Sequence, residues 1–193
     1  TLLPLIRELM QEAGVGFAQL DAIAFGAGPG AFTGLRVACG IAQGLAVARD
    51  LPLVPVTSLE TMAVMTGKNR VLTLLDARMG EVYAGAYLVE GNVAVLQGEI
   101  RVSVPEEVVL PSGEGWTACG NALAAYPALA ERVVAVNMNF HPEILPLASA
   151  VARMAAPRVA RGEGIDSALA APLYIRDKVA KTVAERLREG GKA

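Results

Sequence analysis

The segment AIAFGAGPGAFTGLRVACGIAQGLA, residues 22–46, joins a short apolar run, a turn with several glycines and a stretch of small helix-forming residues. A second apolar run over 52–56 and a second helix pattern over 57–65 follow it directly. The tetrapeptide TSLE at 57–60 forms a capping box that marks the start of this second helix. Strand, helix, strand and helix in this order predict a parallel α/β unit.

The glycine-rich turn lies where a phosphate-binding loop would lie, between a strand and a helix. A Walker loop is excluded because Thr33 and Gly34 stand where its glycine and lysine should be. Gly26, Gly28 and Ala31 match the dinucleotide-binding pattern GxGxxA. That match is weak, because the next strand ends without the acidic residue that would hold a ribose.

The simpler interpretation of this segment is a structural turn, although the helix terminus can still attract an anion. Gly28 and Gly30 permit backbone angles that other residues avoid, and Pro29 between them removes an N–H donor. Thr33 is the expected N-cap of a helix that begins at about Gly34. The predicted structural turn therefore consists of Gly28, Pro29, Gly30, Thr33 and Gly34.

Two helices near the start of the sequence have unusual surfaces. Residues 1–13 predict a helix whose apolar arc is wider than packing on one sheet requires. In the helix over 34–49, Gly40 and Gly44 lie on one face, and each costs about 1 kcal/mol relative to alanine. Two explanations stay open, namely close packing in the core and close approach of a helix from a partner.

The composition excludes several classes of function. The 193 residues carry a formal net charge of −2, so no overall positive charge favours nucleic-acid binding. The apolar fraction of 53% and the mean hydropathy of +0.43 indicate surface that is buried against another molecule. No apolar run has the length of a membrane span, so we expect no membrane association.

The residues that usually carry chemistry are few. Cys39 and Cys119 lie far apart in apolar surroundings, which predicts two buried, reduced thiols and a cytoplasmic protein. His141 has no usual zinc-ligand spacing to either cysteine. Asp76 and Glu81 can form a carboxylate pair, but the better interpretation is that Asp76 or Arg78 fixes the turn and that Glu81 lies at the start of a strand. We therefore expect no catalytic residue, no metal and no cofactor.

A change of pattern near residue 67 predicts a boundary between two parts, residues 1–66 and residues 67–193. Three strands between 71 and 102 predict an antiparallel meander. The other expected elements are a strand, a glycine turn and a helix over 117–131, a strand over 132–137, a helix over 143–162 and a tail helix over 178–192. Pro157 is expected to kink or end the helix that contains it.

Three motifs occur in order along most of the sequence. They are GAGPGAFTGLRVACGIAQGLA followed by LPLVPVTSLETMA, then LLDARMGEVYAGAY, and finally PLYIRD. Together they resemble the TsaB family, also called YeaZ. The resemblance implies an α/β fold of the actin-like ATPase class (ASKHA, ribonuclease H-like) with two similar halves. Because family members begin with a strand-rich region, we expect the initial strands of the first half to be missing here.

The resemblance also implies a function. Members of the family are bacterial cytosolic proteins needed for N6-threonylcarbamoyladenosine at position 37 of tRNA. They are regarded as non-catalytic partners of the catalytic subunit TsaD, with TsaE as an ATP-hydrolysing third component, and they form homodimers when alone. tRNA is then contacted only through the complex. The single His141 agrees with this role, because the catalytic relative holds metal with a paired-histidine motif.

In the family, the first two helices pair with TsaD or with a second copy, which implies an interface on residues 1–13 and 34–49. The expected interface residues are Leu2, Ile6, Leu9, Met10, Arg36, Gly40, Ile41, Gly44 and Leu45. Two such helices from each partner make a four-helix contact. Two alternatives stay open: a nucleotide-binding enzyme of the sugar-kinase type, suggested by the glycine turn, and a self-associating scaffold without TsaD.

Overall fold

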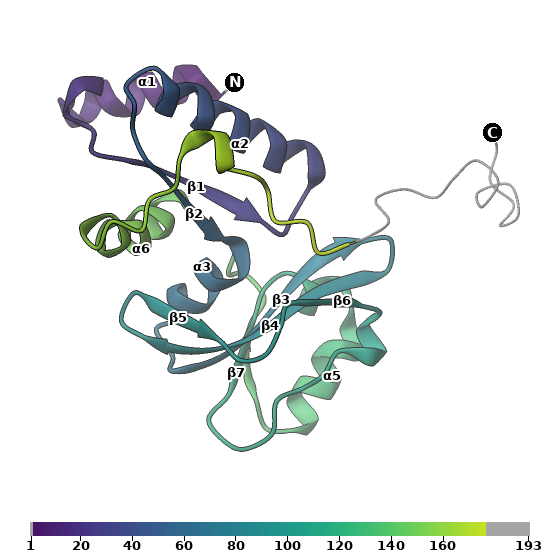
Figure 1. Ribbon diagram of the computed structural model, residues 1–193. Helices are drawn as coiled ribbons and strands as arrows, with labels where there is room; N and C mark the ends of the chain where they lie inside the picture. Colours follow the sequence, from purple (N-terminus) through teal and green to yellow (C-terminus); the bar gives the residue numbers. More distant parts are fainter. Residues whose placement is uncertain (1, 177–193) are drawn as a thin grey trace, which may run out of the picture.

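The computed structural model describes residues 2–176 of the 193-residue chain as two β-sheets with helices around them (Figure 1). The first part contains α1 (Leu2–Ala13), β1 (Ile23–Gly28), α2 (Phe32–Val47), β2 (Leu53–Thr57) and α3 (Ser58–Met65). The second part contains β3 (Arg70–Arg78), β4 (Glu81–Glu90), β5 (Val93–Leu96), β6 (Arg101–Ser103), β7 (Thr117–Cys119), α4 (Ala122–Ala125), α5 (Pro127–Ala135), β8 (Asn139–His141) and α6 (Ala148–Ala160). No helix among the described residues is long and apolar enough to cross a membrane.

The smaller sheet consists of β1 and β2, which pair in parallel. Because successive side chains of a strand point to opposite faces, the two faces of this sheet bury different sets of residues. Helix α2 covers one face, where Ala46 packs beside Phe25. Helix α6 covers the other face, where Met154 packs beside Val54 and Val56. The predicted parallel α/β unit is confirmed, and a helix from far along the chain completes it.

The larger sheet has the strand order β5-β4-β3-β7-β8, and β6 also pairs with β4. Strands β3, β4 and β5 are antiparallel neighbours, which confirms the predicted meander. The third predicted strand is in fact two strands, β5 and β6, which both pair with β4. Helix α3 covers one face through Leu59 and Met62, and α5 covers the other through Leu129 and Val133.

The strand predicted over 132–137 is wrong, because these residues end helix α5 and turn towards β8. Leu129 and Val133 are both fully buried, and their spacing of four residues is that of one helix face. Asn137 then takes a positive φ of 57° in the turn that follows. Burial at a helical period overrides the strand preference of the adjacent valines.

The helix predicted over 143–162 is shorter, because it begins only at Ala148. Pro146 explains the late start, since a proline disfavours helical angles in the residue before it. The helix then continues through Pro157 to Ala160, so this proline does not end it. Its missing N–H removes one hydrogen bond close to the end of the helix. The predicted tail helix over 178–192 lies outside the described residues.

Helices α3 and α6 connect the two sheets. Helix α3 packs on β3 and β4 of the larger sheet, and α6 packs on β1 and β2 of the smaller one as well as on α3. A division into residues 1–66 and 67–193 assigns α6 to the second part of the chain, although it covers the sheet of the first. That division stays a prediction.

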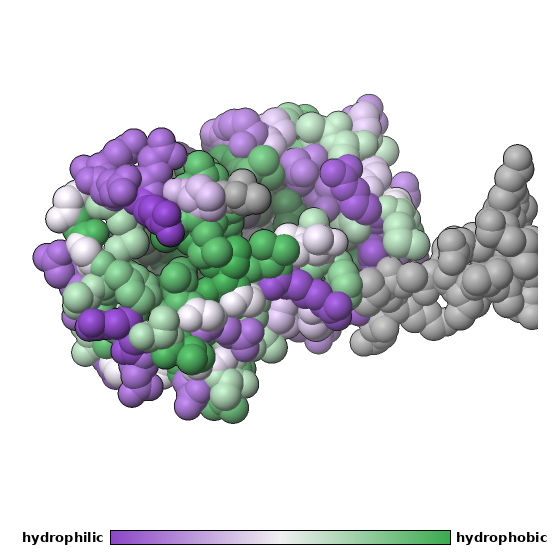
Figure 2. Space-filling model, turned by 90° about the horizontal axis from the view of Figure 1, so that it is seen from above, coloured by the Kyte–Doolittle hydropathy of each residue, from purple (hydrophilic) through white to green (hydrophobic). Residues whose placement is uncertain are grey.

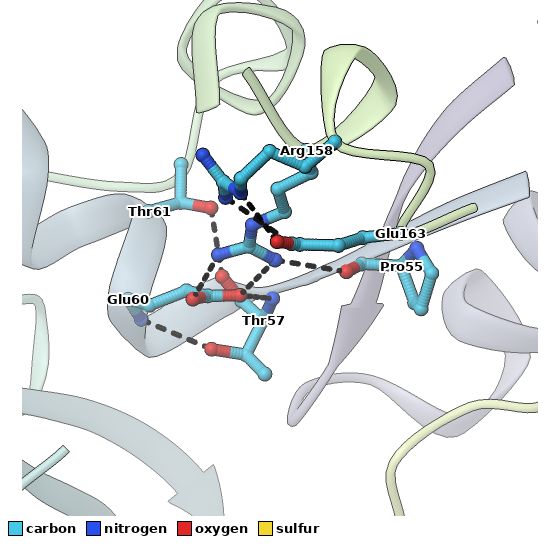
Figure 3. A network of polar contacts seen from close by, with 7 residues as sticks. Pro55, Thr57, Glu60, Thr61, Arg158 and Glu163 are labelled. Carbon is cyan, nitrogen blue, oxygen red and sulfur yellow. Dashed lines mark hydrogen bonds and ion pairs between the residues drawn. The ribbon is translucent and has the colours of Figure 1, made fainter. Parts of the chain in front are cut away.

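A largely buried ion pair joins α3 to α6 (Figure 3). The guanidinium of Arg158 donates to Oε2 of Glu60 at 2.7 Å and to the carbonyl oxygen of Pro55 at 3.3 Å. Oε1 of Glu60 accepts from the Thr57 N–H at 2.6 Å, while Oγ1 of Thr57 accepts from the Glu60 N–H at 3.1 Å. The predicted capping box is therefore confirmed, and its carboxylate also holds α6 in place.

We predict that Arg158→Ala lowers the free energy of unfolding by about 3 kcal/mol, because it leaves the Glu60 carboxylate without its counter-ion in a mostly buried position. Urea unfolding followed by circular dichroism measures this change. Arg161→Ala is the matched control. Arg161 pairs with Glu163 next to the same end of α6, but both side chains are about half exposed, so we expect little change. An equal loss in both variants would contradict the role of the buried pair.

Candidate functional site

The three sequence motifs meet at one cleft, with a cavity of about 470 Å³. Its lining includes Gly30 from the turn before α2, Asp76 and Arg78 from the end of β3, and Tyr174 and Arg176 from the closing motif. These segments lie far apart in the sequence. Packing of α3 and α6 between the sheets therefore brings together residues that no local pattern connects.

The glycine turn requires its first glycine. Gly28 has a φ of +105°, which side-chain-bearing residues rarely adopt. A Cβ at this position would lie 2.9 Å from Cδ1 of Leu35 and 3.2 Å from the carbonyl oxygen of Leu173. The N–H of Leu173 donates to the carbonyl of Ala27 at 2.7 Å, so the closing motif packs directly on the turn. This agrees with a structural turn at Gly28.

Helix α2 begins earlier than predicted, at Phe32, with Ala31 as its N-cap. Thr33 and Gly34 therefore lie inside the first turn of the helix, and the prediction that Thr33 is the N-cap is wrong. The carbonyl of Ala31 already accepts the first helical hydrogen bond, from the Leu35 N–H at 3.0 Å. Alanine offers no side-chain oxygen to cap the helix, so its first N–H groups have no side-chain acceptor on the N-cap residue.

Each carboxylate of the β3–β4 hairpin has its own partner. Asp76 accepts hydrogen bonds from the Arg78 N–H at 2.9 Å and from the Tyr126 hydroxyl at 3.0 Å. Burial, and then this hydrogen bond, raise the pKa of Tyr126, so its hydroxyl is a donor at neutral pH. Glu81 forms an ion pair with Arg176 of the closing motif. The Asp76 contact agrees with a residue that fixes the turn, and Glu81 is the first residue of β4, as the sequence predicted. The ion pair of Glu81 with the closing motif was not predicted.

Both cysteines are free and buried, as the sequence predicted. Burial raises the pKa of the Cys119 thiol to about 12 and also raises that of Cys39, which keeps both thiols protonated and unreactive. Nδ1 of His141 lies 3.3 Å from the Glu143 carboxylate at the surface. Within residues 2–176, no three His, Cys, Asp or Glu side chains are grouped so that they could hold a metal ion.

Helices α1 and α2 present an exposed apolar surface, here called the α1–α2 face (Figure 2). No residue of α1 is buried. Four leucines of α1 are between 39% and 65% exposed, namely Leu2, Leu3, Leu5 and Leu9. Ile6 and Met10 are partly exposed and, with Leu45 of α2, line a shallow cavity of about 590 Å³. The wide apolar arc predicted for the first helix therefore has little cover from the rest of the described chain.

The glycines of α2 lie on the same face. Gly40 and Gly44 are exposed, and a Cβ at either position would have no other atom within 4 Å. Packing within the described chain therefore does not explain them. Arg36 is exposed one turn earlier, while Ile41 and Leu45 are partly exposed beside them. All nine residues expected at the interface are thus at least partly accessible, and their contact with a partner stays a prediction.

The chain matches the family model described as TsaD: tRNA N6-adenosine threonylcarbamoyltransferase over residues 1–184. It is 36% identical over 191 residues to the tRNA threonylcarbamoyladenosine biosynthesis protein TsaB of Escherichia coli (strain K12), covering 93% of this chain and 80% of that protein. The protein of the same name from Haemophilus influenzae is 34% identical, covering 92% of this chain and 79% of that protein.

The chain belongs to the TsaB family. A solved structure of YeaZ from Pseudomonas aeruginosa superposes with a TM-score of 0.80 at 38% identity, covering 90% of this chain and 82% of that one. The predicted TsaB (YeaZ) membership and the α/β fold of the actin-like class are therefore confirmed.

Sequence reasoning missed several residues of this TsaB-family cleft. Phe32 and Tyr174 form an aromatic pair at its edge, with ring centroids 5.8 Å apart. The side-chain oxygen of Asn121 accepts from the Asp76 N–H at 2.9 Å and so holds the end of β3. Tyr174 and Arg176 both lie in the motif PLYIRD, and that motif is the signal by which they could have been found. Asn121 had no signal beyond the glycine before it.

We predict that Gly28→Ala lowers the free energy of unfolding by about 2 kcal/mol, because it combines a positive φ with a close contact to the Leu173 carbonyl. Gly34→Ala is the control, since a Cβ there meets nothing within 4 Å and the position is helical. It should raise stability by up to about 1 kcal/mol. Thermal unfolding of both variants measures the two effects, and a Gly28 variant as stable as the parent would refute the structural role of the turn.

Proposed function

We propose that this chain is a non-catalytic subunit that binds and activates a TsaD-type transferase for the synthesis of N6-threonylcarbamoyladenosine at position 37 of tRNA. Its relatives are named for tRNA threonylcarbamoyladenosine biosynthesis. The observation that carries the proposal is the α1–α2 face, where four leucines of α1 and two glycines of α2 lie exposed without cover from the described chain. In this proposal a TsaE-type ATPase and tRNA join the assembled complex in the bacterial cytoplasm.

The free energy of apolar burial supports docking at this face. Burying one leucine side chain completely contributes about 1.5–3 kcal/mol, and α1 alone exposes four leucines. Contiguous apolar surface of this kind marks interaction sites on soluble proteins. The missing side chains at Gly40 and Gly44 allow the backbone of a second helix to approach α2 closely.

The match to the TsaD family model supports the choice of partner. It extends over residues 1–184, so a TsaD-type subunit and this chain share their fold. Two related folds can present corresponding helices to each other, which forms a nearly symmetric contact. The same geometry accounts for the expected homodimer of the chain alone, since one copy then replaces the partner.

The contacts in the cleft support a non-catalytic role. Glu81 is occupied by Arg176, and Asp76 is occupied by the Arg78 N–H and the Tyr126 hydroxyl. General acid–base work requires a group that can reach the substrate in the correct protonation state. Carboxylates that already hold a hairpin and the closing segment are poorly suited to that work.

We predict that Gly44→Leu abolishes binding to a TsaD-type subunit, and with it tRNA modification in a reconstituted reaction. The added side chain occupies the space that a partner helix needs, and its Cβ meets no neighbouring atom within 4 Å among residues 2–176. Leucine also favours a helix by roughly 1 kcal/mol over glycine, so the variant should fold at least as well as the parent. Ile41→Glu should act in the same direction by placing a charge in the apolar contact.

Ala156→Leu is the matched control, because it adds a similar side chain at an exposed helical position on α6. It should bind normally. Isothermal titration calorimetry with purified subunits measures both affinities. Normal binding by folded Gly44→Leu and Ile41→Glu variants would refute the assignment of the interface.

A self-associating scaffold is distinguished by analytical ultracentrifugation. Our proposal expects a homodimer of the chain alone that dissociates to form a heterodimer when a TsaD-type subunit is added. A homodimer that persists unchanged in the presence of the TsaD-type subunit would favour the scaffold.

A nucleotide-binding enzyme is the second candidate, because the cleft lies at the N-terminus of α2 and is lined by Arg78 and Arg176. Helix N-termini and guanidinium groups favour phosphate. However, these two arginines already pair with Asp76 and Glu81. Calorimetry of the full-length protein alone with ATP and magnesium should therefore show neither tight binding nor turnover. Tight binding with hydrolysis would favour the enzyme.

A further inference from the structure

Three side chains form a cluster at the beginning of α2. The guanidinium carbon of Arg36 lies 3.8 Å from the centroid of the Phe32 ring. Nε of Arg36 donates to the hydroxyl of Tyr174 at 3.1 Å, and the two aromatic rings lie 5.8 Å apart at an angle of 39°. Arg36 is therefore held between an aromatic face and a hydroxyl group although all three residues are exposed.

Holding an exposed arginine in one position is unusual, because a long side chain loses much rotamer freedom when it is fixed. The contact occupies one face of the guanidinium and its Nε. Within residues 2–176, the two terminal nitrogens of Arg36 make no hydrogen bond and no ion pair. The donor pair that normally binds a planar anion is thus oriented in advance and still available.

The position of Arg36 on α2 connects it to the α1–α2 face. Arg36, Gly40 and Gly44 are spaced by four residues, so they form one stripe along the helix. Each step of four residues rises about 6 Å along the helix axis. A helix that lies over the two glycines for its length therefore passes beside the guanidinium of Arg36.

We propose that Arg36 is the charged anchor of the α1–α2 face and binds an aspartate or glutamate side chain on the partner's helix. This inference depends on the proposed function, because it takes the TsaD-type subunit as the partner. A carboxylate fits the two terminal nitrogens of a guanidinium through paired hydrogen bonds. The apolar stripe then provides burial, and Arg36 sets the register and the orientation of the docked helix.

The surroundings favour a protein carboxylate over a nucleic-acid phosphate. The nearby Arg78 and Arg176 pair with Asp76 and Glu81, so Arg36 does not belong to a group of uncompensated cations. The formal net charge of the chain is −2. Binding to a phosphate backbone relies on several unpaired cations together. In the C-terminal direction the stripe continues from Arg36 to Gly40 and Gly44, whose missing side chains suit a helix backbone.

The test measures affinity for a purified TsaD-type subunit by calorimetry and by association and dissociation rates, at low and high salt. Arg36→Gln should weaken binding by at least about tenfold, mainly through faster dissociation. Arg36→Lys keeps the charge but loses the planar donor pair, so its affinity should lie between those of the parent and of Arg36→Gln. Arg153→Gln is the control, because Arg153 is an exposed arginine on α6, and it should bind like the parent.

A charge-reversal scan identifies the partner residue. Arg36→Glu should lose binding, and one Asp→Arg or Glu→Arg change on a helix of the TsaD-type subunit should restore it. All variants are first checked by circular dichroism, and the exposure of Arg36 predicts that they fold.

Each outcome decides between the two proposals. If Arg36→Gln and Arg36→Lys bind the TsaD-type subunit like the parent while Gly44→Leu does not, the anchor is refuted and the proposed function survives. If Gly44→Leu and Ile41→Glu also bind normally, both the anchor and the proposed interface are refuted. If Arg36→Gln leaves subunit affinity unchanged but weakens binding of the complex to tRNA, Arg36 binds phosphate and the carboxylate assignment is wrong.

Discussion

The ion pair between Glu60 and Arg158 is the contact on which the arrangement of the two sheets depends. Glu60 closes the capping box that starts α3, so its position is fixed by the local sequence. Arg158 comes from α6, almost a hundred residues later, and binds the same carboxylate. Because α3 packs on the larger sheet and α6 on the smaller one, this pair links the helices that set the orientation of the two sheets (Figures 1 and 3).

That orientation forms the cleft. The closing motif crosses from the smaller sheet, where Leu173 bonds to the end of β1, to the larger sheet, where Arg176 pairs with Glu81. It thereby ties the glycine turn to the β3–β4 hairpin. The cleft therefore lies where a nucleotide-binding fold has its site. The charged side chains of the cleft form ion pairs that hold these segments together.

The α1–α2 face differs from the cleft, because its apolar side chains stay exposed. Within residues 2–176, the β1–β2 sheet is covered by α2 on one face and by α6 on the other, and α1 belongs to neither core cluster. The leucines of α1 and the glycines Gly40 and Gly44 of α2 stay exposed. Figure 2 shows hydrophobic surface gathered on this side of the molecule. The Phe32–Arg36–Tyr174 cluster connects this face to the cleft, because Phe32 and Tyr174 contact Arg36 and also line the cavity.

Much of the fold was predictable because it depends on short-range patterns. The βαβα order, the capping box at Thr57 and Glu60 and the antiparallel meander each follow from residues close together in the sequence. Predictions failed where burial outweighed local preference. Residues 132–137 are rich in valine, which favours a strand. They end helix α5 instead, because Leu129 and Val133 are buried against the larger sheet at helical spacing. Threonine is a favourable N-cap residue, yet α2 begins at Phe32, directly after the glycine turn, so Thr33 lies inside the helix.

The sequence by itself determined the family, the glycine turn and the two unusual helices, because motif order, φ requirements and side-chain volume are local properties. Only the tertiary structure decided whether Gly40 and Gly44 serve the core or face outward, since that depends on which elements from elsewhere in the chain cover them. It also decided that Arg36, Phe32 and Tyr174 form one cluster, in which the two hydrogen-bonded partners are 138 positions apart in the sequence. Contacts over such separations arise from the packing of whole helices and sheets, which no short segment encodes.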